Sequence, residues 1–563
     1  MAFGDLLEQV GSTGRFQVAH VTLLCMPILM MASHNLLQNF VASVPPHTCS
    51  AHANQSALSR LSQGEVLLVT VPLDQQGQPQ RCQRYAAPQW SLLVPNETAG
   101  SEGGSEGTGP ELQGCTDGWA YNMTEMTSTI ISEWDLVCDL RSLKQMGQTI
   151  YMGGVLVGAL IFGSLSDKYG RRILLLISNL MIAVGGTCAA FSNSFSVFCV
   201  FRFFCGMGLC GLVLNSFSLI VEWIPTHVRT VVGTGTGYCY TMGQLILAVV
   251  AYFIRDWRWL TLAVSLPFYV SFLYSWWFLE SARWLVLNKK SEQAVKNLRA
   301  VARFNGRHEE GEKINLDMLQ ESMKKEMSCS QVTHSALDLF RTPSMRTITV
   351  CLSAVWFSTS FAYYGLSMDL QKFGVDIYLI QVIFGAVDIP AKVVITVSMS
   401  VLGRRPSQCA ALILSGVTIL INLSVPFEKQ MLRTTLAVVG KGCLAASFNC
   451  CYLYSGELYP TVIRQNGMGW VAMMARLGAM VAPMVLLSAD AVPWLPAFIY
   501  GGAPILSGVF AYFLPETLGS PLPDTIQDVE ERGNGKRKSP TSSPRKEELV
   551  LQDPITTLLK ESA

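Results

Sequence analysis

The chain has 563 residues, of which 50% are hydrophobic and only 14% are charged, whereas about 25% of the residues in a soluble domain are charged. The mean hydropathy is +0.33. The formal net charge of +1 argues against a nucleic-acid-binding surface, which would be strongly basic. Composition therefore indicates a membrane protein that contacts the lipid bilayer and no nucleic acid.

Apolar runs recur along the chain, and each is long enough to cross a hydrocarbon core of roughly 30 Å. The first six lie at 17–41, 143–166, 173–192, 196–221, 230–253 and 258–279. The second six lie at 347–370, 374–400, 407–425, 432–456, 466–488 and 494–514. The first run lacks a cleavage site after a short core, so we interpret it as a retained span. We predict an all-α membrane protein with twelve transmembrane helices in two six-helix halves, 17–279 and 347–514.

Basic residues indicate the orientation of these spans. Lys and Arg follow the second, fourth, eighth and tenth runs, and they are frequent in the 280–346 segment and after residue 515. Positively charged loops stay in the cytoplasm. We therefore expect a cytoplasmic N-terminus (1–16), middle loop (280–346) and tail (515–563) in a multi-pass protein.

The 45–142 segment must then lie outside the cell. It carries three glycosylation sequons, at Asn54, Asn96 and Asn122, which are acceptors in extracellular loops. Its four cysteines are expected to form two disulfide bonds in this oxidising compartment, and three pairings are possible. They are Cys49, Cys82, Cys115 and Cys138.

Short phrases occur twice in the chain at a nearly constant offset. EWIPTHVR (222–229) matches ELYPTVIR (457–464), DKYGRR (167–172) matches SVLGRRP (400–406), and Glu280 matches Glu516. Each phrase lies at the cytoplasmic end of a predicted helix. Three matches near one offset indicate two halves related by an axis along the membrane normal.

Charges in these phrases could pair across the halves in one conformation and separate in another. The alternative is that they only fix the topology. The candidate latch residues are Asp167, Arg171, Glu222, Arg229, Glu457 and Arg464.

Several motifs resemble a known family. GSLSDKYGRR (163–172) is similar to the signature loop of the major facilitator superfamily, and PETLGSPLPDTIQD (515–528) narrows the likeness to the solute carrier 22 family. FAYYGLSMDLQ (361–371), FGAVDIPAK (384–392) and GKGCLAASFNC (440–450) resemble its organic anion transporter branch. The resemblance covers nearly the whole chain and implies secondary active transport by alternating access.

Charged residues inside spans mark candidate binding sites, because each costs about 2.5–3.5 kcal/mol at a helix centre. Arg476 and Lys392 both lie roughly 16–18 Å from the cytoplasmic face, near the bilayer midplane where transporters bind cargo. Asp388 precedes Lys392 by four residues, so these two could instead neutralise each other. Arg476 has no acidic residue in its span before Asp490 and is the preferred anion anchor. Arg202 is interpreted as structural.

Aromatic residues at a similar depth would suit organic anions. They are Tyr240, Trp356, Tyr363, Tyr364, Phe448 and Tyr452. The resemblance implies that these positions, with Lys392 and Arg476, line the cavity together with Asn35, Asn39 and Met31 of the first span. It also implies that organic cation carriers have an acid where this chain has Arg476. Glycines in VVGTGTGY (231–238) lack the context of a nucleotide loop and are interpreted as helix-packing residues.

We thus expect a multispecific organic anion transporter of the plasma membrane, which exchanges small carboxylates and sulfated or aromatic anions for an intracellular dicarboxylate. No catalytic constellation, metal or cofactor is expected. One alternative is a cation or zwitterion carrier anchored by Asp388. Another is a ligand-sensing receptor built on a carrier fold.

Overall fold

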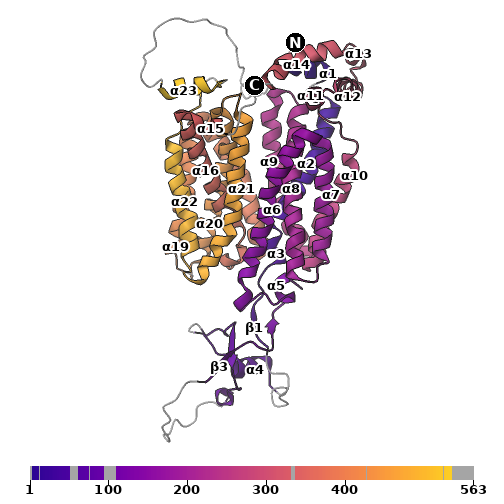
Figure 1. Ribbon diagram of the computed structural model, residues 1–563. Coiled ribbons are helices and arrows are strands. Elements are labelled where there is room, and N and C mark those ends of the chain that lie inside the picture. The colour runs from indigo at the N-terminus through magenta and orange to yellow at the C-terminus, as the bar shows by residue number, and fades with distance from the viewer. Residues whose placement is uncertain are drawn as a thin grey trace, which may run out of the picture.

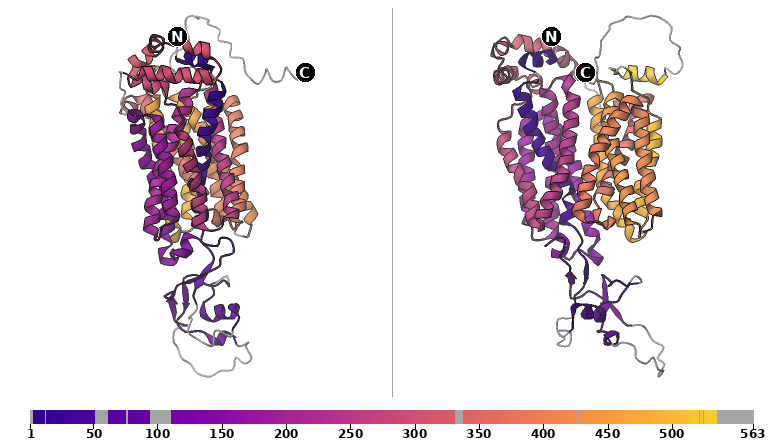
Figure 2. Two further views of the ribbon diagram at one scale, coloured as in Figure 1. Left: turned by 90° about the vertical axis from the view of Figure 1, so that its right-hand side faces the viewer. Right: turned by 180° about the vertical axis from the view of Figure 1, so that it is seen from behind.

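A computed structural model describes residues 3–11, 13–50, 61–74, 77–93, 110–330, 337–426, 428–520, 522–523 and 525–534. Two bundles of long helices lie side by side, and each is built from one half of the chain (Figures 1 and 2). The N-terminal bundle contains α2 (Arg15–Leu36), α6 (Ser142–Tyr169), α7 (Arg171–Ala190), α8 (Phe195–Trp223), α9 (Thr226–Phe253) and α10 (Trp257–Ser275). The C-terminal bundle contains α16 (Pro343–Ser367), α17 (Ile377–Ala386), α18 (Asp388–Val401), α19 (Arg404–Ser424), α20 (Gln430–Leu458), α21 (Arg464–Leu486) and α22 (Leu495–Tyr512).

Ten helical segments among the described residues are long and apolar enough to cross a membrane. Most of the predicted spans coincide with these segments. The spans predicted at 258–279 and 347–370 correspond to α10 and α16, which stand in the same bundles (Figure 1). Both helices are rich in Ser, Thr and Tyr, so their place in the bundle rests on packing against α7 and α21. The prediction of an all-α membrane fold in two halves is confirmed.

Two spans are interrupted. The span predicted at 374–400 divides at Val387 into α17 and α18, just before Pro390, which cannot donate a helical hydrogen bond. The first span divides at Leu37 into α2 and the short α3 (Gln38–Val41). Backbone groups at such breaks are free to bond with neighbouring helices.

Close helix packing within the N-terminal bundle depends on glycine. A Cβ atom at Gly154 would lie 2.2 Å from the carbonyl oxygen of Phe203, and one at Gly206 would lie 2.3 Å from that of Tyr151. The interpretation of Gly233 and Gly235 as packing residues is wrong. A Cβ atom at either position would meet nothing within 4 Å, so both glycines border open space.

The 45–142 segment projects from one end of the bundles, here called the loop end (Figure 1). β1 (His47–Cys49) pairs with β4 (Trp119–Tyr121), and β2 (Gln83–Tyr85) pairs with β3 (Leu112–Gly114), both antiparallel. Its helical segments are α4 (Gln63–Thr70), η2 (Trp90–Leu93), α5 (Ile130–Glu133) and η3 (Cys138–Leu140).

Two disulfide bonds join these strands and turns. Cys49 pairs with Cys115 and Cys82 pairs with Cys138. His47 lies near the second pair, but sulfur atoms in a disulfide are not thiolate ligands for a metal ion. Asn122 is exposed just after β4, whereas the sequons at Asn54 and Asn96 lie outside the described residues.

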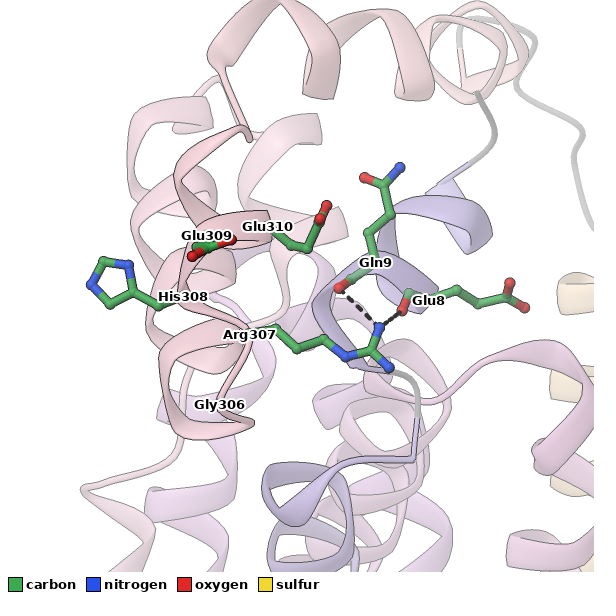
Figure 3. A pocket seen from close by; sticks show the side chains of 7 residues that line it. All are labelled: Glu8, Gln9, Gly306, Arg307, His308, Glu309 and Glu310. Carbon is green, nitrogen blue, oxygen red and sulfur yellow. Dashed lines mark hydrogen bonds between the residues drawn. The ribbon is translucent and has the colours of Figure 1, made fainter.

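Short helices gather at the opposite end, here called the terminal end (Figure 1). They are α1 (Phe3–Gly11), α11 (Ala282–Leu287), α12 (Ser291–Phe304), α13 (His308–Glu312), α14 (Leu316–Ser330), α15 (Asp338–Arg341) and α23 (Ile526–Asn534). Arg307 donates to the carbonyl oxygens of Glu8 and Gln9 and so caps the last turn of α1 (Figure 3). Glu530 of α23 accepts hydrogen bonds from the backbone and hydroxyl of Ser344 at the start of α16. Each terminal helix is thereby fixed to its own half.

The two halves contact each other from mid-height to the loop end. Phe40 stacks on Tyr378, with ring centroids 5.6 Å apart. The backbone amide of Val44 donates to Gln371 at 2.8 Å, near η4 (Leu370–Phe373). α21 ends in η5 (Leu487–Asp490) at the same end. The loop end is therefore closed in this conformation.

Candidate functional site

The repeated phrases form equivalent structures in the two halves. Gly170 and Gly403 have φ angles of +96° and +104°, which glycine adopts without strain, and each precedes a helix. Glu280 accepts from the backbone amides of Arg171 and Arg172 at 3.1 and 3.0 Å. Glu516 likewise accepts from the amides that follow Gly403, both at 3.0 Å. Carboxylates stabilise helix N-termini in this way.

Glu516 lies after α22, outside the spans. Desolvation acts to raise the pKa of its carboxyl group, but hydrogen bonds from the backbone amides of residues 404, 405, 517 and 518 outweigh it. The pKa therefore falls below its ordinary value. The carboxylate stays ionised at neutral pH and holds the start of α19.

The predicted latch residues pair within their own halves in this conformation. Arg171 forms ion pairs with Asp167 at 3.2 Å and Glu222 at 3.4 Å. Glu457 pairs with Arg404 at 3.0 Å, an arginine that the sequence analysis did not select. Arg464 donates to the carbonyl oxygen of Tyr459, and Arg229 lies half-buried in the first turns of α9. Arg171 and Glu457 thus have partners in their own halves here, and whether they pair across the halves in another conformation stays a prediction.

Asp388 does not form the ion pair with Lys392 that the sequence left open as an alternative. Asp388 instead pairs with Lys441 of α20 at 2.6 Å, and both side chains are buried, at 2% and 0% exposure. Lys441 also donates to the carbonyl oxygen of Phe384 at the α17–α18 break. Because Lys441 comes from a neighbouring helix, the four-residue spacing of Asp388 and Lys392 did not decide the pairing.

The buried ion pair reaches across to the N-terminal half through Gln244 of α9. The Gln244 amide donates to Asp388 and to the hydroxyl of Tyr363, both at 3.2 Å. Its oxygen accepts from Lys441 at 3.4 Å, and the Tyr363 hydroxyl donates to Asp388 at 3.3 Å. Every polar atom of this pair thus has a partner, as buried charges require.

Lys392 is half-buried in α18 and contacts neutral groups of α9. Its ammonium group donates to the carbonyl oxygen of Gly237 at 2.7 Å and to the hydroxyl of Thr241 at 2.9 Å. It also lies 5.5 Å from the ring centroid of Tyr238. No carboxylate among the described residues forms an ion pair with Lys392, although the Asp388 carboxylate acts on its charge from a greater distance.

Arg476 lies half-buried in α21. The charge of its guanidinium group acts on the Cys210 thiol of α8 and on the hydroxyls of Tyr364 and Tyr452. In the part of the chain that the structure describes, no acidic side chain forms an ion pair with it. Arg476 is therefore a guanidinium placed where the two halves meet, among neutral polar groups.

The predicted aromatic residues form one continuous chain of contacts. Ring centroids are 4.8 Å apart for Tyr452 and Trp356, 6.2 Å for Trp356 and Phe448, and 5.3 Å for Phe448 and Tyr363. Tyr363 contacts Tyr364 at 5.4 Å.

The chain of contacts then crosses to the N-terminal half. The hydroxyls of Tyr364 and of Tyr240 on α9 act on each other electrostatically, and the Tyr240 hydroxyl accepts from Asn35 of α2 at 3.4 Å. Side chains far apart in sequence thus surround one region between the halves.

Exposure indicates that this region is hollow. Trp356 is only 2% exposed, yet Tyr452, packed against it, is 57% exposed. The charge of Arg476 acts on the Tyr452 hydroxyl, so we infer that the exposed face of the Tyr452 ring points to the space between the halves. Gly456 and Gly469, nearer the terminal end, likewise border open space. The space opens toward the terminal end.

Two predicted residues of the first span have other surroundings. Asn39 donates to the carbonyl oxygen of Ser367 at 2.7 Å and so helps to close the loop end. Met31 is half-buried against a core cluster that is mostly N-terminal and also includes Tyr364 and Met480.

Arg202 of α8 is buried. Its guanidinium group is hydrogen-bonded to the His34 ring at 3.2 Å and to the His34 carbonyl oxygen at 3.0 Å, and it lies 4.1 Å from the ring centroid of Tyr151. Its placement inside one half fits the structural interpretation.

Lys441 and Gln244 are the main residues that sequence reasoning missed. Lys441 lies within an apolar run, GKGCLAASF, at the tenth span. The available signal was a lysine inside one predicted span together with an aspartate inside another, because the two opposite charges could pair. Gln244 carried no such signal, because a neutral amide in a span is ordinary.

Comparisons with known proteins agree with this geometry. Residues 111–527 match the family model described as sugar (and other) transporter. A protein named solute carrier family 22 member 6 from Danio rerio is 74% identical over 564 residues, with 100% of both chains covered. Proteins of the same name from Pseudopleuronectes americanus and Oryctolagus cuniculus are 73% and 51% identical, covering 100% and 98% of this chain and the same shares of their own.

Solved structures show the same fold at lower identity. The inward open xylose transporter XylE from E. coli matches with a TM-score of 0.55 and 20% identity, over 70% of this chain and 90% of that one. Its partially occluded inward open form matches with a TM-score of 0.53 and 18% identity, over 67% and 89% of the two chains.

Proposed function

Because this chain belongs to the solute carrier 22 family and is an organic anion transporter of the major facilitator superfamily, we propose that it exchanges extracellular organic anions for an intracellular dicarboxylate. The proposed cargo comprises small carboxylates and sulfated or aromatic anions. The proposed location is the plasma membrane, with the terminal end in the cytoplasm and the loop end outside the cell.

Arg476 is the observation that carries this proposal. Its guanidinium borders an aromatic-lined space between the halves, and no carboxylate of the described residues forms an ion pair with it. The planar fork of a guanidinium matches a carboxylate or sulfate in two parallel hydrogen bonds. Lys392 supplies a second cation, which could exchange its neutral acceptors on α9 for a carboxylate of the cargo.

The aromatic chain suits the organic part of the cargo. Tyr452, Trp356 and Phe448 present ring faces and edges, and hydroxyls of Tyr240 and Tyr364 offer hydrogen bonds. Apolar walls with a few placed polar groups are typical of small-molecule sites. Such walls hold ligands of different shape, which supports multispecific recognition.

Alternating access follows from how the halves meet. Here the loop end is closed and the space at Tyr452 opens toward the terminal end. An outward-facing state would require the contacts of Phe40, Asn39 and Gln244 with the C-terminal half to separate. The latch residues Arg171 and Glu457, which now pair within their halves, would then be near the opposite half and free to exchange partners.

Exchange is tested with proteoliposomes preloaded with glutarate or with buffer. The proposal predicts that internal glutarate stimulates uptake of a labelled aromatic carboxylate several-fold in the wild type. Arg476→Asp should abolish this uptake while the amount of folded, inserted protein stays the same. Equal uptake with and without internal glutarate would contradict exchange, and normal uptake by Arg476→Asp would contradict the site.

The alternative of a cation carrier anchored by Asp388 is disfavoured, because Asp388 is buried against Lys441. Competition by anionic and cationic probes separates the two: only anions should inhibit. Binding of an anion without accumulation in the same vesicles would instead support a ligand-sensing receptor.

A further inference from the structure

Two free cysteines from different helices lie side by side near the proposed anion site. Cys25 belongs to α2 and Cys239 to α9, and both are half-buried. The Cys25 thiol interacts electrostatically with the Cys239 thiol and the Thr236 hydroxyl. Neither residue has a role in the proposed transport mechanism.

The packing of the two helices independently places these side chains together. α2 and α9 pack along each other and run in the same direction, from the terminal end to the loop end. A Cβ atom at Gly243 would lie 3.0 Å from the Cβ of Ala32 and 1.9 Å from the carbonyl oxygen of Leu29. The helix backbones are therefore very close at this level.

The register continues from that contact toward the terminal end. Cys25 lies two turns before Ala32, and Thr236 and Cys239 lie two turns and one turn before Gly243. Residues separated by four and seven positions share one helix face. Cys25 is therefore expected to lie opposite the helix segment between Thr236 and Cys239. The interactions of its thiol with these two side chains agree with this register.

The surroundings make the pair accessible. Gly233 and Gly235, one to two turns closer to the terminal end on α9, border open space. The flanking residues Gly237 and Thr241 hold the Lys392 ammonium group, whose charge also acts on Cys239. Residues two positions apart lie on opposite faces of a helix, so a ligand on the two sulfur atoms would lie across α9 from Lys392.

We propose that Cys25 and Cys239 form a binding site for a soft, two-coordinate metal ion such as Hg(II). Thiolates select soft metal ions, and two of them satisfy a linear coordination. With mercuric chloride, each thiol releases one proton, two sulfur–mercury bonds form and two chloride ions leave. The bound metal ties α2 to α9 one residue before Tyr240, on the helix that holds Lys392 from its other face, and inhibits anion uptake.

The first test measures uptake after treatment with mercuric chloride and removal of unbound metal by gel filtration. Cys25→Ala and Cys239→Ala should each raise the half-inhibitory concentration at least tenfold, and the double variant should not raise it further. Cys443→Ala, a half-buried thiol of α20, serves as the matched control and should behave as wild type. Methylmercuric chloride, which has one coordination position for a thiol, should distinguish these variants much less.

The second test does not depend on transport. Purified protein is treated with one equivalent of mercuric chloride, alkylated with a maleimide, and analysed by peptide mass spectrometry. The site predicts that Cys25 and Cys239 are protected together in the wild type and that neither is protected in the variant lacking the other. Protection of one thiol alone, or wild-type sensitivity of both single variants, would overturn the proposal.

Discussion

Lys392 and Lys441 lie in neighbouring helices of the same half, yet their surroundings differ in the one respect that decides their role. Lys441 is fully buried against Asp388, and further acceptors complete its hydrogen bonds. Lys392 is half-buried and donates only to a carbonyl and a hydroxyl group of the other half. A lysine inside a span is structural when the fold supplies its counter-charge, and it is available for cargo when the fold does not.

The largest expected effect comes from breaking the buried pair. Lys441→Met leaves the Asp388 carboxylate buried without a counter-charge, which should cost about 3–5 kcal/mol in the free energy of unfolding. The measurement is thermal unfolding of purified protein together with its surface expression. Unchanged stability would show that Asp388 does not depend on Lys441.

The paired variant sharpens this result. Asp388→Asn combined with Lys441→Met removes both charges and keeps an amide that can bond with Gln244 and Tyr363. Replacing a buried ion pair as a unit is often neutral, so most of the lost stability should return. Failure of the double variant to recover would mean that the charges act separately.

Lys392→Met should have the opposite profile. Its acceptors are neutral, so we expect a change in the free energy of unfolding below about 1 kcal/mol. The KM for a dicarboxylate should rise about tenfold or more, because a charge-assisted hydrogen bond contributes about 1.5–3 kcal/mol. Uptake kinetics and a melting curve on the same preparation check both parts, and an unchanged KM would remove Lys392 from the site.

Gln244→Leu should give the smallest effect, because the bonds of Gln244 to Tyr363, Asp388 and Lys441 are long, at 3.2–3.4 Å, and the two charges keep each other as partners. Losing about 1 kcal/mol from this conformation raises the population of the alternative state about fivefold. A cysteine introduced by Phe40→Cys reports the alternative state. Residue 40 is 0% exposed while the loop end is closed, and it becomes accessible only when that end opens. Labelling of this cysteine by a membrane-impermeant maleimide should be about fivefold faster with Gln244→Leu than without it, and an equal rate would contradict the coupling.

Much of the fold was predictable because its signals are local or periodic. Apolar runs gave the spans, and the spacing of Glu280 and Glu516 gave two equivalent halves, whose carboxylates occupy matching helix N-termini. The even number of outer-loop cysteines indicated disulfides, although their pairing required the three-dimensional arrangement.

The depth of the proposed site residues was predictable from the spans, whereas their bonding partners were not. Arg476 stood out because a lone cation in a span is expensive. The partner of Asp388 could not be read from spacing, since Lys392 is one turn away in sequence while Lys441 approaches from another helix. The latch residues posed the same difficulty, because the sequence does not show in which conformation each ion pair forms.

Equilibrium binding of labelled glutarate to purified protein tests the central claim most directly, namely that uncompensated cations between the halves hold the anion. We predict that Arg476→Asp weakens binding at least a hundredfold, whereas Asp388→Asn with Lys441→Met changes it by less than about threefold, or roughly 0.7 kcal/mol. Wild-type affinity in a folded Arg476→Asp protein would contradict the account.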